Sequence, residues 1–104
     1  MKYALPTDDG TTVGKTFGRA RSFAIHDEAK PGFGVFENEG AQAEHGAGTG
    51  AVAFLAEKGV TTVLAPELGP KAAAALRQAG IAYIPTAAGQ NLDAALTEAL
   101  GRRA

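Results

Sequence analysis

The chain has 104 residues, of which 45% are hydrophobic and 20% are charged, and its formal net charge at pH 7 is −1. This length and composition indicate one globular domain, and the near-neutral charge without a basic stripe argues against nucleic acid as the main partner. The absence of cysteine excludes disulfides and metal centres held by thiolates. No apolar run is long enough to span a membrane, so we expect a cytoplasmic protein with no membrane partner.

The first segment, Lys2–Pro6, is predicted to form a strand that ends at the turn signal Asp8-Asp9-Gly10. Its apolar residues are nearly continuous rather than alternating, which is typical of a strand in the centre of a sheet. A loop follows over Thr11–Arg21. Phe17 in this loop is interpreted as a core residue. An arginine such as Arg19 is more often a solvated or paired charge than a ligand-holding residue, and both roles stay open for it here.

Two further strands, Ser22–Glu28 and Phe33–Asn38, are predicted to form an antiparallel hairpin. The turn between them contains Lys30-Pro31-Gly32, a combination that breaks strands and favours a tight connection. His26 lies within the first strand of this hairpin. We interpret it as a structural histidine on a face of the sheet rather than as a ligand.

After the hairpin, alanine-rich helical patterns alternate with short apolar or β-branched runs. The predicted elements are a helix from about Thr49 to Lys58, a strand at Val60–Ala65, a helix at Pro70–Ala79, a strand at Ile81–Pro85 and a final helix that begins near Leu92. Gly59 and Gly80 are placed to end the first two helices. Asn91 is placed to cap the start of the last helix.

This order of elements predicts a mixed five-stranded sheet with helices packed on it. The two βα units of the second half need parallel strands, and the hairpin adds antiparallel ones. In such sheets, ligands bind outside the carboxyl ends of the parallel strands. We therefore expect one rim built from the loop with Asp8 and Asp9, residues 66–69, residues 86–90 and the loop that holds His45.

The densest run of glycine is His45-Gly46-Ala47-Gly48-Thr49-Gly50, which leads directly into a predicted helix. A helix N-terminus presents unpaired N–H groups and a partial positive charge, so it favours anions. On local chemistry alone, however, glycine before a helix more often marks a turn that needs a positive φ. The run is neither a Walker loop nor a dinucleotide-binding fingerprint, because both need a different spacing.

Several short motifs occur in an order that resembles a known family. They are Ala4-Leu5-Pro6-Thr7-Asp8, Phe17-Gly18-Arg19-Ala20, His45-Gly46-Ala47-Gly48, Gly69-Pro70-Lys71-Ala72 and Ala79-Gly80-Ile81. With these motifs the chain is similar, over nearly its full length, to the dinitrogenase iron–molybdenum cofactor biosynthesis family. Members include the NifX and NafY type of domain and the C-terminal part of NifB.

The resemblance implies a ribonuclease H-like fold with three α/β/α layers, and binding or carriage of an iron–molybdenum cofactor or its iron–sulfur precursor without catalysis. Cofactor-assembly proteins would then be further partners. Because such a cluster is anionic, we expect Arg19, Lys71 and the segment with Gly46 and Gly48 to hold it. His45 is the expected metal ligand. Many members carry histidine before the Phe-Gly-Arg run, whereas this chain has Thr16, and a hydroxyl is a poor replacement for imidazole on iron.

Three other functions remain open at this point. The fold would also suit a metal-dependent nuclease in which Asp8 and Asp9 hold magnesium, although Asp8-Asp9-Gly10 is explained more simply as a turn. A phosphate or nucleotide could bind at Gly46–Gly50. A protein-interaction or anion-binding module of the same fold, no longer binding a cluster, is the remaining alternative.

Overall fold

The computed structural model describes residues 1–39 and 47–103, and over these residues the chain forms five strands and three helices. The elements are β1 (Lys2–Thr7), β2 (Ser22–Asp27), β3 (Gly34–Glu37), α1 (Ala47–Glu57), β4 (Thr62–Ala65), α2 (Pro70–Ala79), β5 (Ala82–Pro85) and α3 (Leu92–Arg103). All the predicted elements are present, with ends that differ by a few residues. None of the described helices has both the length and the hydrophobicity that a membrane span needs.

The strands form one mixed sheet in the order β3-β2-β1-β4-β5, with β1 in the centre as predicted. β1 pairs antiparallel with β2 and parallel with β4, and β4 pairs parallel with β5. The predicted hairpin is confirmed, because β2 and β3 pair antiparallel with Ser22 opposite Glu37. This arrangement is compatible with the expected ribonuclease H-like motif.

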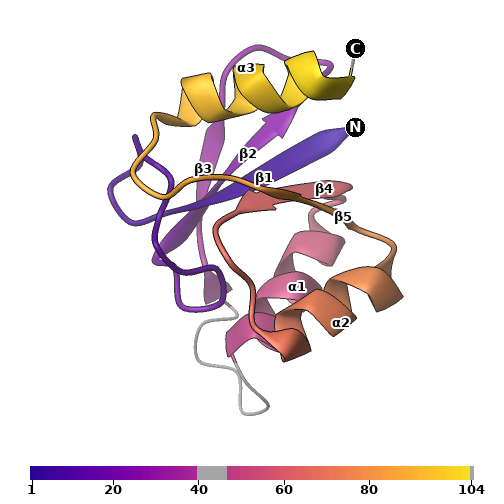
Figure 1. The fold of residues 1–104 in the computed structure, drawn as a ribbon. Coiled ribbons are helices and arrows are strands. Elements are labelled where there is room, and N and C mark those ends of the chain that lie inside the picture. The colour runs from indigo at the N-terminus through magenta and orange to yellow at the C-terminus, as the bar shows by residue number, and fades with distance from the viewer. Residues whose placement is uncertain (40–46, 104) are drawn as a thin grey trace.

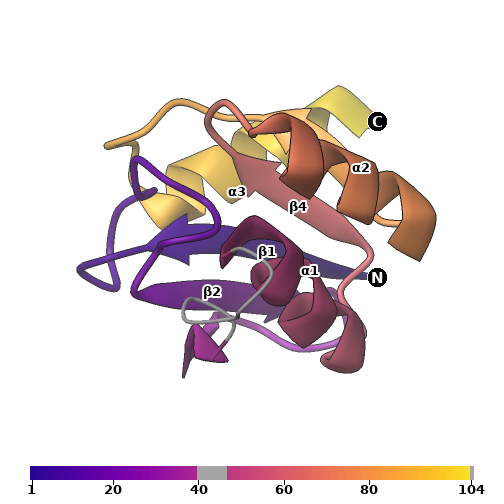
Figure 2. The same cartoon turned by 90° about the horizontal axis from the view of Figure 1, so that it is seen from below.

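Helices cover both faces of the sheet, which makes the expected three layers (Figures 1 and 2): α1 and α2 lie on one face and α3 lies on the other. The alternation of side chains in β1 divides the core accordingly, because Ala4 faces α1 and α2 whereas Tyr3 and Leu5 face α3. All three are fully buried. β1 is therefore apolar on both sides, as its nearly continuous apolar sequence indicates.

The predicted helix ends are confirmed by their hydrogen bonds. Gly59 and Gly80 have φ of 78° and 73°, and the residue after each donates its N–H to a carbonyl five residues earlier: Val60 to Leu55, and Ile81 to Leu76. This is the Schellman arrangement, in which glycine adopts the left-handed conformation at no steric cost. At the start of α3, the Asn91 side chain accepts the N–H of Asp93 at 2.9 Å.

The turn after β1 is organised by the carboxylate of Asp9. It accepts the backbone N–H groups of Thr11 and Thr12 at 2.8 Å each and the Thr12 hydroxyl at 2.8 Å. These bonds favour the charged form and hold the pKa of Asp9 well below its ordinary value. Asp9 is thus the structural centre of the turn.

The rest of the β1–β2 connection is tied to the sheet and to the loop before α3. Gly14 donates its N–H to the Pro6 carbonyl at 2.7 Å. Val13 makes two bonds to the loop before α3: its N–H donates to the Gln90 carbonyl and its carbonyl accepts the Gly89 N–H, both at 2.8 Å. The segment that follows, residues 15–21, therefore begins from a fixed point.

We predict that Asp9→Asn lowers the free energy of unfolding at neutral pH. The loss of this free energy between neutral and acid pH should be smaller in the variant. Because the folded state lowers this pKa, the stabilisation is complete above the unfolded value, near 3.8, and is lost as the pH falls toward the folded value. Urea unfolding at pH 7 and pH 3 should show a smaller difference for the variant than for the unmodified chain. Glu57→Gln, at an exposed residue of α1, is the control, and an unchanged acid dependence in Asp9→Asn would contradict this assignment.

Candidate functional site

A cleft of about 550 Å³ lies where the segments that follow β1 and β4 meet the beginnings of α1 and α2. Figure 1 shows these parts gathered at one end of the molecule. The lining residues are Lys15, Thr16, Phe17, Gly18, Arg19, Gly48, Glu67, Leu68, Gly69, Pro70, Lys71 and Ala72. Because β1 and β4 are parallel neighbours, their carboxyl ends share one edge of the sheet, and the cleft occupies the place where such sheets bind ligands.

Cations predominate among the described residues of the cleft. Lys15, Arg19 and Lys71 line it and are exposed, and Glu67 is the acidic residue among them. Three cations and one carboxylate give these lining residues a formal charge of +2, although the whole chain has a net charge of −1. The fold therefore concentrates positive charge at this one place, which favours an anionic ligand.

The N-terminus of α2 forms part of the same wall. Gly69 is its N-cap and makes no side-chain capping bond, and Pro70 follows at the first helical position. The first intrahelical bond runs from the Ala73 N–H to the Gly69 carbonyl at 3.0 Å. Helix geometry leaves the N–H groups of the second and third helical residues, Lys71 and Ala72, without an intrahelical acceptor, and the helix dipole adds to the positive potential.

Gly48 lies in the first turn of α1, directly against α2. A Cβ placed on Gly48 would come within 3.0 Å of the Cβ of Ala72, and Ala72 is itself buried. The two helices therefore approach closely at their N-terminal ends because residue 48 has no side chain. Gly48 contributes to the cleft by this close approach.

The opposite wall of the cleft, residues 17–19, is fixed by the packing of Phe17 and by hydrogen bonds from Asn38. The ring of Phe17 is buried and packs on Phe23 with ring centroids 5.3 Å apart. Phe17 is thus a core residue, as predicted. Its burial leaves the following residues at the surface, where Gly18 is half-buried and Arg19 exposed.

Asn38, which the sequence analysis did not single out, fixes the backbone around Arg19. Its side-chain amide donates to the carbonyl of Gly18 at 3.0 Å and to that of Ala20 at 2.9 Å. Asn38 is 6% exposed, and burying an amide is favourable only when it is hydrogen-bonded. The sequence signal was a polar residue at the end of the predicted strand Phe33–Asn38, and this signal does not distinguish a buried residue from an exposed one.

The structure brings together three of the five predicted cluster-binding residues, Arg19, Gly48 and Lys71. The other two, Gly46 and the expected metal ligand His45, lie outside the described residues. Thr16 lines the cleft beside Arg19. Among the described residues, no group of three or more His, Cys, Asp or Glu side chains is arranged to hold a metal ion.

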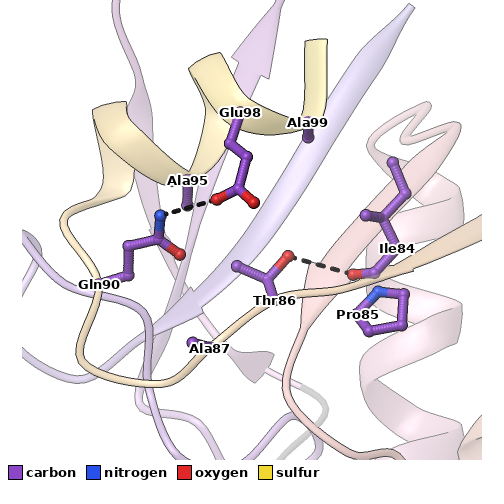
Figure 3. A pocket seen from close by; sticks show the side chains of 8 residues that line it. All are labelled: Ile84, Pro85, Thr86, Ala87, Gln90, Ala95, Glu98 and Ala99. Atoms are coloured by element: carbon purple, nitrogen blue, oxygen red, sulfur yellow. Dashed lines mark hydrogen bonds between the residues drawn. The ribbon is translucent and has the colours of Figure 1, made fainter. Parts of the chain in front are cut away.

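The expected single rim is divided between the two faces of the sheet. From residues 86–90, Thr86, Ala87 and Gln90 line a separate hollow of about 150 Å³. Its other lining residues are Ile84, Pro85 and the α3 residues Ala95, Glu98 and Ala99 (Figure 3). There the Gln90 amide donates to the Glu98 carboxylate at 3.2 Å. Because the chain passes from β5 to α3 on the opposite face, this loop leaves the cleft side of the sheet.

Asp8 and Asp9, considered as magnesium ligands of a nuclease, are both engaged in the turn after β1. An Asp8 oxygen accepts the N–H of Arg21 at 2.9 Å, and the Asp9 carboxylate holds Thr11 and Thr12. Neither residue lines the cleft. The interpretation of Asp8-Asp9-Gly10 as a turn accounts for both carboxylates.

His26 has the structural role expected of it. Its Nδ1 lies 2.8 Å from the Gly32 carbonyl, and its ring packs between those of Tyr3 and Phe33, at centroid distances of 6.4 Å and 5.8 Å. These contacts join the end of β2 to the connection that leads into β3, on the α3 side of the sheet and away from the cleft.

Known proteins similar to this chain share its fold. The apo form of the orange protein from Desulfovibrio gigas is 30% identical, with a TM-score of 0.88, and the match covers 97% of this chain and 88% of that one. A candidate NifB protein from Thermotoga is 29% identical, with a TM-score of 0.78 over 97% of this chain and 87% of that one.

By sequence, an uncharacterized protein of Methanocaldococcus jannaschii is 34% identical over 85 residues, which cover 78% of this chain and 70% of that protein. The family model of the dinitrogenase iron–molybdenum cofactor matches residues 1–102. This chain therefore belongs to the dinitrogenase iron–molybdenum cofactor family.

Proposed function

We propose that this protein is a non-enzymatic carrier of an anionic metal–sulfur cluster, the iron–molybdenum cofactor or its iron–sulfur precursor, and that the cleft between residues 15–19 and 67–72 is where it binds. The observation that carries the proposal is the accumulation of Lys15, Arg19 and Lys71 around one cleft at the start of α2. Family membership indicates what kind of anion the cleft receives.

The size and shape of the cleft support a ligand of this class. Its volume of about 550 Å³ is within the range of small-molecule and cofactor sites, roughly 300–1,000 Å³. Exposed cations at its edge attract an anion over a distance of about one Debye length, and unpaired N–H groups at a helix start bind it at short range. Neither interaction needs a covalent bond to the metal.

The donor atoms of the described cleft fit an electrostatically held cargo better than a covalently ligated one. Thr16 offers a hydroxyl, and soft metal–sulfur centres prefer thiolate or imidazole. We retain His45 as the proposed single metal ligand and Gly46 as a contact, because they precede α1, whose first turn lines the cleft at Gly48. A carrier with few covalent ligands can also release its cargo readily.

The relatives support the same proposal. The orange protein structure is described as an apo form, which implies that this relative also has a form with a bound group.

The exposed large apolar side chains of the described residues give less support to a protein-interaction module. Val35 and Phe36 are successive residues of β3 and so point to opposite faces, and the Lys58 ammonium lies 4.7 Å from the centre of the Phe36 ring.

Removing a cleft cation should weaken binding of the isolated iron–molybdenum cofactor. We expect Arg19→Gln and Lys71→Gln each to raise the dissociation constant about threefold to tenfold, since an exposed charge near an anion contributes on the order of 1 kcal/mol. Anaerobic titration followed by gel filtration and electron paramagnetic resonance measures this. Lys30→Gln, in the β2–β3 turn and outside the cleft lining, is the matched control, and equal effects of all three variants would refute the cleft as the site.

Removing the acidic residue should have the opposite effect. Glu67→Gln keeps the size of the side chain but removes a negative charge from the cleft wall, so we expect the same titration to give an affinity about twofold to fivefold higher. Glu57→Gln, on the exposed side of α1, should leave the affinity unchanged. A loss of affinity in Glu67→Gln would mean that this carboxylate holds the ligand rather than repelling it.

The proposed metal ligand is tested by His45→Ala. If His45 binds the metal, the variant should retain weakened binding through the cleft cations, and the electron paramagnetic resonance signal of the bound cofactor should change. If affinity and signal stay the same, His45 is not a ligand and the carrier is purely electrostatic. His26→Ala, which removes the structural histidine, is the comparison for effects on folding.

A further inference from the structure

Tyr83, a residue of β5, reaches from outside the cleft to the segment that forms one of its walls. Its hydroxyl donates to the Pro66 carbonyl at 2.7 Å and lies 3.2 Å from the Ala65 carbonyl. Tyr83 does not line the cleft, and its ring packs, partly buried, against the core beneath α1 and α2. It therefore contacts the wall from the side away from a ligand.

The segment held in this way is short and connects β4 directly to α2. Residues 66–69 include Glu67 and Leu68, which line the cleft, and Gly69, which is the N-cap of α2. Before this segment, the Thr86 N–H donates to the Ala65 carbonyl at 2.9 Å, and after it the first helical bond joins Ala73 to Gly69. Among the described residues, the side chain that donates a hydrogen bond to the stretch between these two bonds is Tyr83, through its hydroxyl.

Leu68 connects the same tyrosine to the cleft by packing. Leu68 and Tyr83 both line an adjacent apolar hollow of about 330 Å³ beside α2, and Leu68 also lines the cleft. Both side chains pack against the same core. A displacement of Tyr83 or of the Pro66 peptide would therefore reach the cleft wall through Leu68 as well as through the backbone.

We infer that Tyr83 is a positioning residue, which fixes the wall formed by Glu67, Leu68 and Gly69 and, through it, the N-terminus of α2 that faces an anionic ligand. As far as the ligand is concerned, this inference rests on the proposed function. The order of the wall itself can be measured without any ligand.

The chemistry of the group suits a permanent donor. Burial raises the pKa of Tyr83 above its ordinary value of 10, and the negative charge of Glu67 raises it further. The hydroxyl thus keeps its proton at neutral pH and can donate to a carbonyl, which a deprotonated phenolate could not do. Phenylalanine fills nearly the same space without this donor.

The other wall of the cleft is held independently. Asn38 donates to the carbonyls of Gly18 and Ala20 around Arg19, whereas the Tyr83 hydroxyl donates to the Pro66 carbonyl of the other wall. Loss of the Tyr83 hydroxyl should therefore affect residues 66–73 and leave residues 17–21 as they are. An effect confined to residues 66–73 would show that Tyr83 positions this wall, whereas a general contribution to stability would affect both walls.

The test is Tyr83→Phe, with Tyr3→Phe as the matched control. These are the two tyrosines of the chain, and the Tyr3 hydroxyl donates to Glu28 on the α3 side of the sheet. Amide hydrogen exchange is measured on the ligand-free protein at two amides in the first turns of helices. The Ala73 N–H of α2 donates to the Gly69 carbonyl, and the Ala95 N–H of α3 donates to the Asn91 carbonyl. In Tyr83→Phe we expect exchange at Ala73 to rise about fivefold, as loss of one hydrogen bond allows, with Ala95 unchanged.

Titration with the isolated iron–molybdenum cofactor at a temperature well below unfolding should then show an affinity about fivefold lower in Tyr83→Phe and unchanged in Tyr3→Phe. Equal increases in exchange at Ala73 and Ala95, or no increase at Ala73, would overturn the inference. If the unmodified chain does not bind the cofactor, the proposed function fails. The exchange experiment still decides whether Tyr83 holds the wall.

Discussion

The parallel pairing of β1 with β4 is the constraint on which the rest of this structure depends. It brings the carboxyl ends of two strands that are about 55 residues apart in sequence to the same edge of the sheet, with Tyr3 opposite Thr62 and Ala4 opposite Val63. The connection after β1 and the connection after β4 must then leave side by side. The cleft is the space between these two connections, closed by the N-terminal ends of α1 and α2.

The electrostatics of the site follow from this geometry rather than from composition. A chain with ten basic and eleven acidic residues has no overall preference for anions, yet Lys15 and Arg19 from one connection and Lys71 from α2 meet around one hollow. The start of α2 adds unpaired N–H groups, and Gly48 lets α1 approach it closely. Glu67 reduces this positive potential, which suits the proposed carrier, since a carrier must also release its cargo.

Much of this architecture could be predicted from the sequence, because local signals and tertiary structure agree. Gly59, Gly80 and Asn91 mark helix ends by their own backbone and side-chain chemistry, and the apolar continuity of Lys2–Pro6 indicates a central strand. Arg19 and Lys71 were expected as ligand-holding residues from the family resemblance rather than from the order of elements, and both line the cleft. The roles of Asn38 and Tyr83 could not be predicted, because each depends on hydrogen bonds to carbonyls that are remote in sequence. The expected single rim was wrong at residues 86–90, because no local pattern indicates which face of the sheet α3 covers. It was also wrong at Asp8 and Asp9, which do not line the cleft.

The most direct test of the proposed cationic cleft is the salt dependence of cofactor binding by the unmodified protein. Affinity for isolated iron–molybdenum cofactor would be measured anaerobically by gel filtration and electron paramagnetic resonance at ionic strengths between about 0.02 and 0.5 M, across which the Debye length shrinks severalfold. We predict stoichiometric binding that weakens steeply as salt is added, because exposed cations hold the cluster in the proposed site. Absence of binding at low salt, or an affinity independent of salt, would contradict a cleft that recognises its ligand by charge.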